Sequence, residues 1–242
     1  MKERQEQYIN SIKSDLNQYT NNEKASFLPR FFKTGAGEYG EGDKFIGVTV
    51  PNQRKVARKY YNDIELDELE MLLREPIHEY RLTALFILCL KYEKTKEDYI
   101  KHTIVNLYLN NLQYVNNWDL VDSSAYLILG PHLFNNNKDI LYEFARSNDL
   151  WKQRIAIITT NHFIRNNQYD DTLKIAEILL DNKHDIIHKA VGWMLREIGN
   201  RNVNVEIEFL QKHYQKMPRT MLRYAIEKFD EDLRQKFLKG MV

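Results

Sequence analysis

The segment "NNWDLVDSS" (residues 116–124) carries side chains whose types and spacing could do chemistry. If a helix begins near Asn117, Trp118 and Asp122 lie one turn apart on the same face. A carboxylate beside the electron-rich face of an indole can stabilise a positive charge. The spacing therefore marks Trp118 and Asp122 as a candidate reaction centre.

The two aspartates of this segment call for different explanations. An asparagine before the helix can cap it, and Asp119 suits the positive end of the helix dipole, so capping accounts for Asp119. Asp122 lies beyond the first turn, where capping does not explain it. From spacing alone, a catalytic role for Asp122 and a salt bridge to a basic residue of the next repeat, such as Arg154, are equally favoured.

Two later helical segments combine cations with a second tryptophan. Lys152 and Arg154 begin the otherwise apolar run "DLWKQRIAII", and "HKAVGWMLRE" places Lys189, Trp193 and Arg196 on one helix. Aromatic and cationic side chains on one face suit a nucleic-acid groove better than a core. We expect these five residues to line such a groove.

Three other patterns are weaker candidates. "GAGEYG" (35–40) matches G-x-G-x-x-G, but a helical segment precedes it, so we reject a dinucleotide site and expect a flexible loop. "HDIIH" (184–188) resembles a zinc motif, yet His184 should precede the helix and no third ligand is evident, so we expect no metal. Gly192 costs its helix about 1 kcal/mol, which points to a close approach, most simply by a neighbouring helix.

The elements that position these residues are predicted to be helices. Apolar residues recur every three or four positions almost throughout, and "FIGVTV" (45–50) is the only strand-like run, followed by Pro51 at an expected helix start. Related runs begin at residues 81, 117, 154 and 189, at intervals of 35 to 37 residues. Such a period is typical of HEAT-like helix pairs, and its phasing puts Trp118 and Trp193 at equivalent or neighbouring positions.

The fold prediction is therefore an all-α, right-handed α-solenoid of HEAT-like helix pairs with a concave basic groove. Residues 1–242 should form a single HEAT-like repeat domain, in which 1–50 hold N-terminal helices and a Gly-rich loop and 51–242 hold the helical repeats.

Composition excludes several classes of protein. No apolar run approaches the ~20 residues of a membrane span, and the N-terminus lacks the apolar core of a signal peptide, so we expect a cytoplasmic protein without membrane contact. The single cysteine, Cys89, lies in an apolar run and should be a small buried side chain. A net charge of +1 gives no global sign of a polyanionic partner, so any such partner needs a local basic face.

Taken together, "NNWDLVDS", "WKQR" and "KAVGWMLRE" resemble the AlkD-type DNA alkylation repair enzymes, a family of HEAT-like repeat alkylpurine DNA glycosylases. The segment "FFKTGAGEYGEGDKFIGV" is also similar to one found in the broader family, and the resemblance covers nearly the whole chain. It implies binding of double-stranded DNA and hydrolytic release of cationic alkylpurines, chiefly N3-methyladenine and N7-methylguanine, without base flipping and without a cofactor.

The resemblance also assigns roles to matching residues. It implies that Asp122 is the catalytic carboxylate, that Trp118 and Trp193 form aromatic walls, and that Arg154 holds the DNA backbone near the lesion. Phe31 stands where the best-studied type has Tyr, and the glycine segment is longer here, so the family pattern does not settle the N-terminal contacts.

No lysine is positioned as a Schiff-base nucleophile, so we expect a monofunctional glycosylase, acting as a monomer. The alternative is a non-catalytic HEAT-like scaffold that binds DNA or protein, which would be expected to lack the Asp or tryptophan set.

Overall fold

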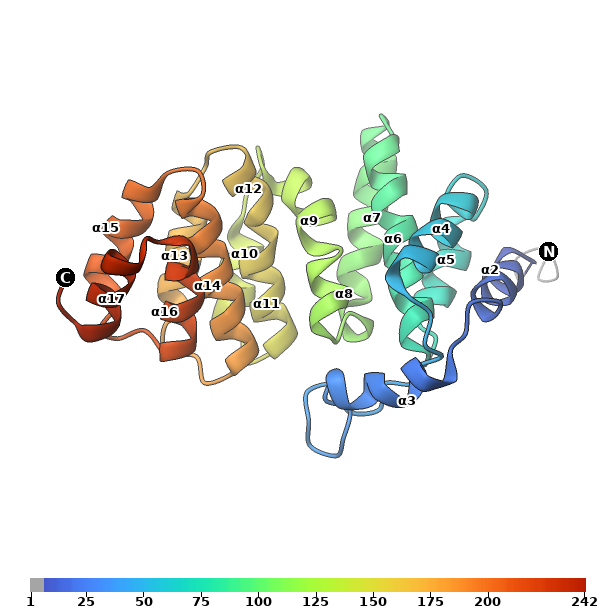
Figure 1. Ribbon diagram of the computed structural model, residues 1–242. Helices are drawn as coiled ribbons and strands as arrows, with labels where there is room; N and C mark the ends of the chain where they lie inside the picture. The colour runs from blue at the N-terminus through green and yellow to red at the C-terminus, as the bar shows by residue number, and fades with distance from the viewer. Residues whose placement is uncertain (1–6) are drawn as a thin grey trace. The chain divides into compact units, whose positions relative to one another are not determined.

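The computed structural model describes residues 7–242, and these residues form helices joined by turns, with no strand (Figure 1). The all-α prediction is confirmed. The strand-like run at 45–50 is not a strand: Lys44 and Ile77 form one isolated bridge, and α4 (Val50–Tyr60) begins one residue before Pro51. Within residues 7–242, every helix is too short or too polar to cross a lipid bilayer.

The chain divides into two compact units, Met1–Ile128 and Leu129–Val242. The helices that lie wholly in the first unit are α2 (Gln7–Asn17), α3 (Asn22–Phe31), α4, α5 (Leu66–Leu73), α6 (His78–Lys94), α7 (Asp98–Asn110) and α8 (Trp118–Asp122). The division falls within α9 (Ala125–Leu133).

In the first unit, α6 is the central helix. It lies among α4, α5, α7 and α8 and contacts all four (Figure 1). Its residues from His78 to Cys89 are all buried. A helix that is apolar around most of its circumference must be covered on all sides, and "LTALFILCL" meets that requirement. Cys89 is buried as predicted, and burial raises the pKa of its thiol to about 12.

The second unit is built around α14 (Asp185–Gly199) in the same way. Its other helices are α10 (Asp139–Arg146), α11 (Leu150–Thr159), α12 (Asn161–Arg165), α13 (Asp170–Ile178), α15 (Val203–His213), α16 (Arg219–Ala225) and α17 (Glu231–Lys239). Helix α14 contacts α11, α12, α13, α15 and α16 through a stripe of apolar side chains from Ile187 to Ile198.

The predicted repeat starts coincide with helices. Residue 81 lies in α6, residue 117 caps α8, and residues 154 and 189 lie in α11 and α14. That Trp118 and Trp193 occupy equivalent or neighbouring repeat positions stays a prediction. Trp118 is the first residue of α8, and Trp193 lies about two turns into α14.

Gly192 has a packing explanation. A Cβ atom at this position would lie 2.4 Å from the Met221 carbonyl oxygen and 2.5 Å from Cβ of Tyr224. The glycine therefore allows α14 and α16 to pack closely, and the simpler interpretation of its sequence signal is confirmed.

Candidate functional site

Helix α8 carries the two candidate residues of the first unit. It begins at Trp118, as predicted, and the side chain of Asn117 accepts a hydrogen bond from the Trp118 backbone N–H at 2.9 Å. Trp118 and Asp122 occupy its first and last positions and are both half-buried. A helix of five residues has too few internal hydrogen bonds to be stable alone, so its neighbours must hold it in place.

Aromatic rings fix Trp118. Its indole stacks on Phe32, with ring centroids 5.2 Å apart and planes inclined by 17°, and meets Phe31 edge-to-face at 5.8 Å. Phe32 stacks in turn on Phe45 at 5.1 Å. Phe31 and Phe27 are 50% and 60% exposed, so the cluster extends from the core to the surface of α3. The family pattern left the role of Phe31 open, and the structure places its ring against Trp118.

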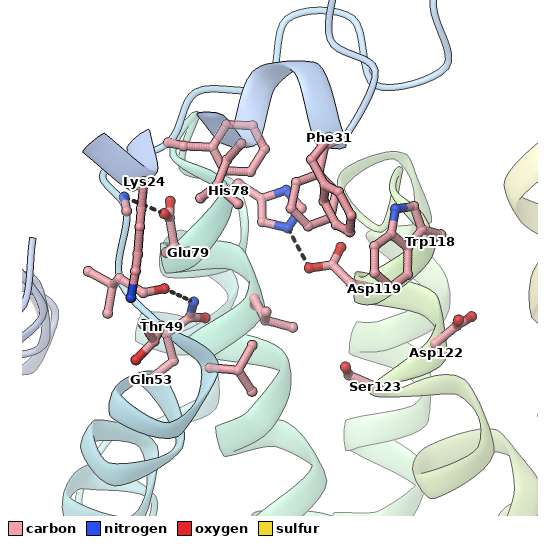
Figure 2. A pocket seen from close by; sticks show the side chains of 17 residues that line it. Lys24, Phe31, Thr49, Gln53, His78, Glu79, Trp118, Asp119, Asp122 and Ser123 are labelled. Atoms are coloured by element: carbon pink, nitrogen blue, oxygen red, sulfur yellow. Dashed lines mark hydrogen bonds and ion pairs between the residues drawn. The ribbon is translucent and has the colours of Figure 1, made fainter. Parts of the chain in front are cut away.

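Asp122 lines a pocket of about 440 Å³ that lies entirely within the first unit (Figure 2). The lining is mostly apolar and aromatic, with polar groups spread around it. The polar lining residues are Lys24, Thr49, Gln53, His78, Glu79, Asp119, Asp122 and Ser123. Trp118 and Asp122, the two candidate residues of α8, therefore line the same pocket.

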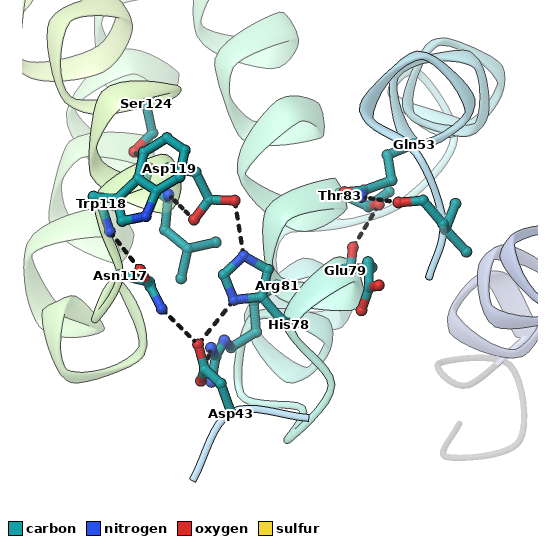
Figure 3. Close-up of polar contacts among 12 residues, drawn as sticks. Asp43, Gln53, His78, Glu79, Arg81, Thr83, Asn117, Trp118, Asp119 and Ser124 are labelled. Atoms are coloured by element: carbon teal, nitrogen blue, oxygen red, sulfur yellow. Dashed lines mark hydrogen bonds and ion pairs between the residues drawn. The ribbon is translucent and has the colours of Figure 1, made fainter. Parts of the chain in front are cut away.

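A buried chain of ionisable groups, which includes the pocket-lining residues His78 and Asp119, connects three segments of the first unit (Figure 3). His78, at the start of α6, is 2.8 Å from Oδ2 of Asp119 through Nε2 and 2.9 Å from Oδ2 of Asp43 through Nδ1. Arg81 donates to Oδ1 of Asp43 at 2.5 Å. We call His78, Asp43, Asp119 and Arg81 the Asp43–His78 network.

The network carries two acids and two bases. Burial alone would lower the pKa of His78, but Asp119 and Asp43 outweigh it and raise that pKa to about 9. Burial of Asp43 opposes its ionisation, yet His78 and Arg81 hold the pKa of its carboxyl below the ordinary value. The imidazolium and guanidinium therefore balance the two carboxylates at neutral pH.

Asp119 does more than the predicted capping. Its Oδ1 accepts from the Leu120 backbone N–H at 2.9 Å, which satisfies one N–H at the helix start, while its Oδ2 pairs with His78. Capping thus explains only one of the two carboxylate oxygens.

The Gly-rich segment delivers Asp43 to the network. The Asn117 amide donates to Oδ2 of Asp43 at 3.0 Å, and a Cβ atom on Gly40 would lie 2.4 Å from the Phe32 carbonyl oxygen. At Gly47, where φ is +78°, the backbone N–H donates to the Glu79 carboxylate at 2.8 Å. Asp43 and Gly47 lie outside residues 35–40, for which a flexible loop stays a prediction. Helix α3 precedes "GAGEYG", which agrees with the rejection of a dinucleotide site.

The candidate residues of α11 lie in the second unit. Arg154 is buried, with 5% of its surface exposed, and its guanidinium donates to the Ile186 backbone carbonyl at the start of α14. Lys152 is half-buried, with its ammonium 5.8 Å from the centre of the Phe144 ring. Arg154 is therefore linked to the helix that carries Trp193.

The candidate residues of α14 are partly exposed and engaged with acids. Lys189 pairs with Asp185 at 2.6 Å, Arg196 pairs with Glu227, and the Trp193 indole N–H donates to Glu197 at 3.0 Å. His184 is the residue before the helix, as predicted. Within residues 7–242 no cluster of His, Cys, Asp or Glu side chains is arranged to hold a metal ion.

Comparison with known proteins shows which family the chain resembles. The family profile described as "DNA alkylation repair enzyme" matches residues 12–229. The chain belongs to the DNA alkylation repair enzyme family. Membership supports a role in DNA repair, with DNA as the partner.

A solved structure also resembles this family member. It is described as a predicted DNA alkylation repair enzyme from Enterococcus faecalis, with 16% sequence identity and a TM-score of 0.68, over 88% of this chain and 97% of that one. At 16% sequence identity, this structural similarity establishes the shared fold alone. Comparison with curated proteins gave no match.

Sequence reasoning missed the Asp43–His78 network of this family member, although His78 and Asp119 line the pocket. The position of His78 in the sequence was the available signal. A protonated histidine at the start of a helix is unfavourable, because it lies beside the positive end of the helix dipole. His78 at the beginning of α6 therefore calls for carboxylate partners, and Asp43 and Asp119 supply them.

Proposed function

We propose that the protein is a monofunctional DNA glycosylase that hydrolyses the N-glycosidic bond of cationic alkylpurines in duplex DNA. N3-methyladenine and N7-methylguanine are the proposed substrates, and the purine leaves without being flipped out of the helix. Family membership supports the DNA repair role. The observation that carries the finer proposal is that Trp118 and Asp122 line one pocket at the two ends of α8.

The chemistry of the substrate explains why these residues suffice. Alkylation of a ring nitrogen makes the purine cationic and weakens its bond to the sugar, so the base departs neutral and needs no general acid. As the bond breaks, positive charge develops on the sugar, as in glycoside hydrolysis. The Asp122 carboxylate would stabilise that charge and position or deprotonate the attacking water.

Trp118 would add a charge-dependent attraction. A cation over an indole face gains about 0.5–2 kcal/mol. Because this attraction grows with the positive charge, it favours the transition state and the damaged base over undamaged DNA. The stack on Phe32 holds the ring in a fixed orientation before substrate arrives. Trp193 is the proposed second indole, and Lys152, Arg154, Lys189 and Arg196 are the proposed DNA contacts.

The decisive experiment is incubation with methylated duplex DNA, without added metal, followed by identification of the released bases. Wild-type protein should release methylated purines. Asp122→Asn should lower the release rate by about 100-fold or more, while duplex affinity stays near that of wild type. Salt-sensitive duplex binding without release by either protein would favour the non-catalytic scaffold, and full activity in Asp122→Asn would refute the catalytic assignment.

A further inference from the structure

The two carboxylates of α8 pose an electrostatic problem for the proposed reaction. Asp119 and Asp122 line the same pocket and are three positions apart, a spacing that puts Cβ atoms about 5–6 Å from each other. Two ionised carboxylates this close repel each other. A reaction that needs Asp122 ionised therefore needs Asp119 to be neutralised by another group.

His78 is placed to neutralise Asp119. Its Nε2 is 2.8 Å from Oδ2 of Asp119, and its ring is 2% exposed, so water does not screen the pair. Figure 2 shows the Asp119 carboxylate turned toward His78 and the Asp122 carboxylate turned away from both. Both acids of α8 thus line the same pocket, but only Asp119 pairs with His78.

The same imidazole anchors α8 in position. Asn117 and Asp119, on either side of Trp118, bind Asp43 and His78 respectively. Trp118 itself stacks on Phe32, and the Phe32 ring lies 4.9 Å from the His78 ring. Three consecutive residues at the start of α8 are therefore tied, directly or through one ring, to the Asp43–His78 network.

We propose that His78 is a positioning residue of this site: its imidazolium neutralises Asp119 and fixes α8, so that Asp119 adds no uncompensated negative charge beside Asp122. The inference rests on the proposed function, because it takes Asp122 as the reacting carboxylate. His78 touches no reacting atom in this scheme and acts entirely through Asp119 and the placement of α8.

The surrounding charges are consistent with this assignment. Asp43 and Arg81 contact each other beside His78, and Glu79, next to it on α6, binds backbone N–H groups of Ile46 and Gly47. Around Asp122, the charged groups lining the pocket in the described part of the first unit are Lys24, His78, Glu79 and Asp119, and the buried Tyr108 of α7 also interacts with it. Because Asp119 and Asp43 raise the pKa of His78 to about 9, its imidazole is charged at neutral pH.

The test is the titration of Asp122 by carboxyl carbon NMR in the full chain, with Asp122→Asn used to assign the signal. His78→Gln leaves Asp119 charged without its cation and should raise the midpoint of Asp122 by about one pH unit. Asp119→Asn leaves His78 without one of its acids and should lower that midpoint. The double variant His78→Gln/Asp119→Asn removes both charges and should return the midpoint close to that of wild type.

A purely structural role for His78 predicts none of these opposite shifts. Lys59→Gln is the matched control, because it removes a cation 2.6 Å from Asp15 elsewhere in the same unit and should not move the Asp122 midpoint. If both single variants fold and leave the midpoint unchanged, the inference is wrong. If His78→Gln does not fold, Asp119→Asn and the double variant still decide, since an unshifted Asp119→Asn contradicts it.

Activity distinguishes this inference from the function on which it rests. The acid limb of the pH–rate profile for base release should move in parallel with the NMR midpoints. Expected NMR shifts in a protein that releases no base would uphold the electrostatic role and overturn the glycosylase proposal. Base release that depends on Asp122, without midpoint shifts in the variants, would overturn the role of His78 alone.

Discussion

His78 in the first unit and Glu206 in the second are both buried ionisable groups with raised pKa values, and the causes are opposite. Burial would lower the pKa of His78, and two carboxylates raise it to about 9. Burial raises the pKa of Glu206 to about 8, and the charge of Arg196 offsets this only in part. His78 is therefore held in its charged form, whereas Glu206 is held in its neutral form.

The hydrogen bonds of the two groups differ accordingly. Both ring nitrogens of His78 are paired, while Oε1 of Glu206 is buried without a hydrogen-bond partner among the described residues. Glu206 fills the space left by Gly199, where a Cβ atom would lie only 1.7 Å from its Oε2. Burial of an ionisable side chain alone thus does not identify a functional site. A completed network that converges on a pocket is the more informative feature.

The largest expected effect on folding comes from His78. Its folded pKa of about 9 exceeds the ordinary value of 6.5, so the stability it contributes is fully present below about pH 6.5 and is lost as pH rises through 9. His78→Gln should lower the free energy of unfolding at pH 6 by about 3 kcal/mol, because it leaves buried carboxylates without their cation. Urea unfolding between pH 6 and 9.5 measures both effects, and equal stability of the two proteins at pH 6 would contradict them.

Glu206→Gln should have a smaller effect of the opposite sign. The folded pKa of Glu206, about 8, also exceeds its ordinary value of 4.5, so wild-type stability falls as pH rises from 4.5 to 8. An amide that cannot ionise avoids this loss, and we expect a gain of about 1–3 kcal/mol at pH 8. Below pH 4.5 the two proteins should be similar. A variant less stable than wild type at pH 8 would show that Glu206 is charged and paired.

The sequence predicted the elements better than the contacts between them. Asparagine capping located the start of α8, and the 35–37-residue period located α6, α11 and α14, because both signals are local or periodic. The pairing of Asp43 with His78 joins residues 35 apart through an irregular segment, and no periodicity encodes such a contact. The sequence predicted Arg154 as a groove cation or a partner of Asp122, and only the structure shows that it is buried and donates to the Ile186 carbonyl.

Arg154→Ala tests whether the buried cation of the second unit contributes to DNA binding. If its guanidinium contacts a phosphate, the variant should bind methylated duplex about 3- to 10-fold more weakly, and the slope of log affinity against log salt should fall by about 0.9. Lys212→Gln is a suitable control, because it removes a cation that pairs with Glu208 on the exposed face of α15. Unchanged affinity across the salt series, together with lower stability, would restrict Arg154 to holding α11 against α14.

Trp193→Ala should give the smallest effect on folding and tests whether the second unit contributes to the reaction at all. The indole is half-buried and donates to Glu197 at the helix surface, so its removal should change the melting temperature little. Loss of one cation–indole contact should slow base release by about 2- to 30-fold, the equivalent of 0.5–2 kcal/mol. Trp193→Phe keeps an aromatic face and should retain more activity. A collapsed melting temperature in Trp193→Ala would instead make Trp193 a packing residue, and the chemistry would then be confined to the unit that holds Trp118 and Asp122.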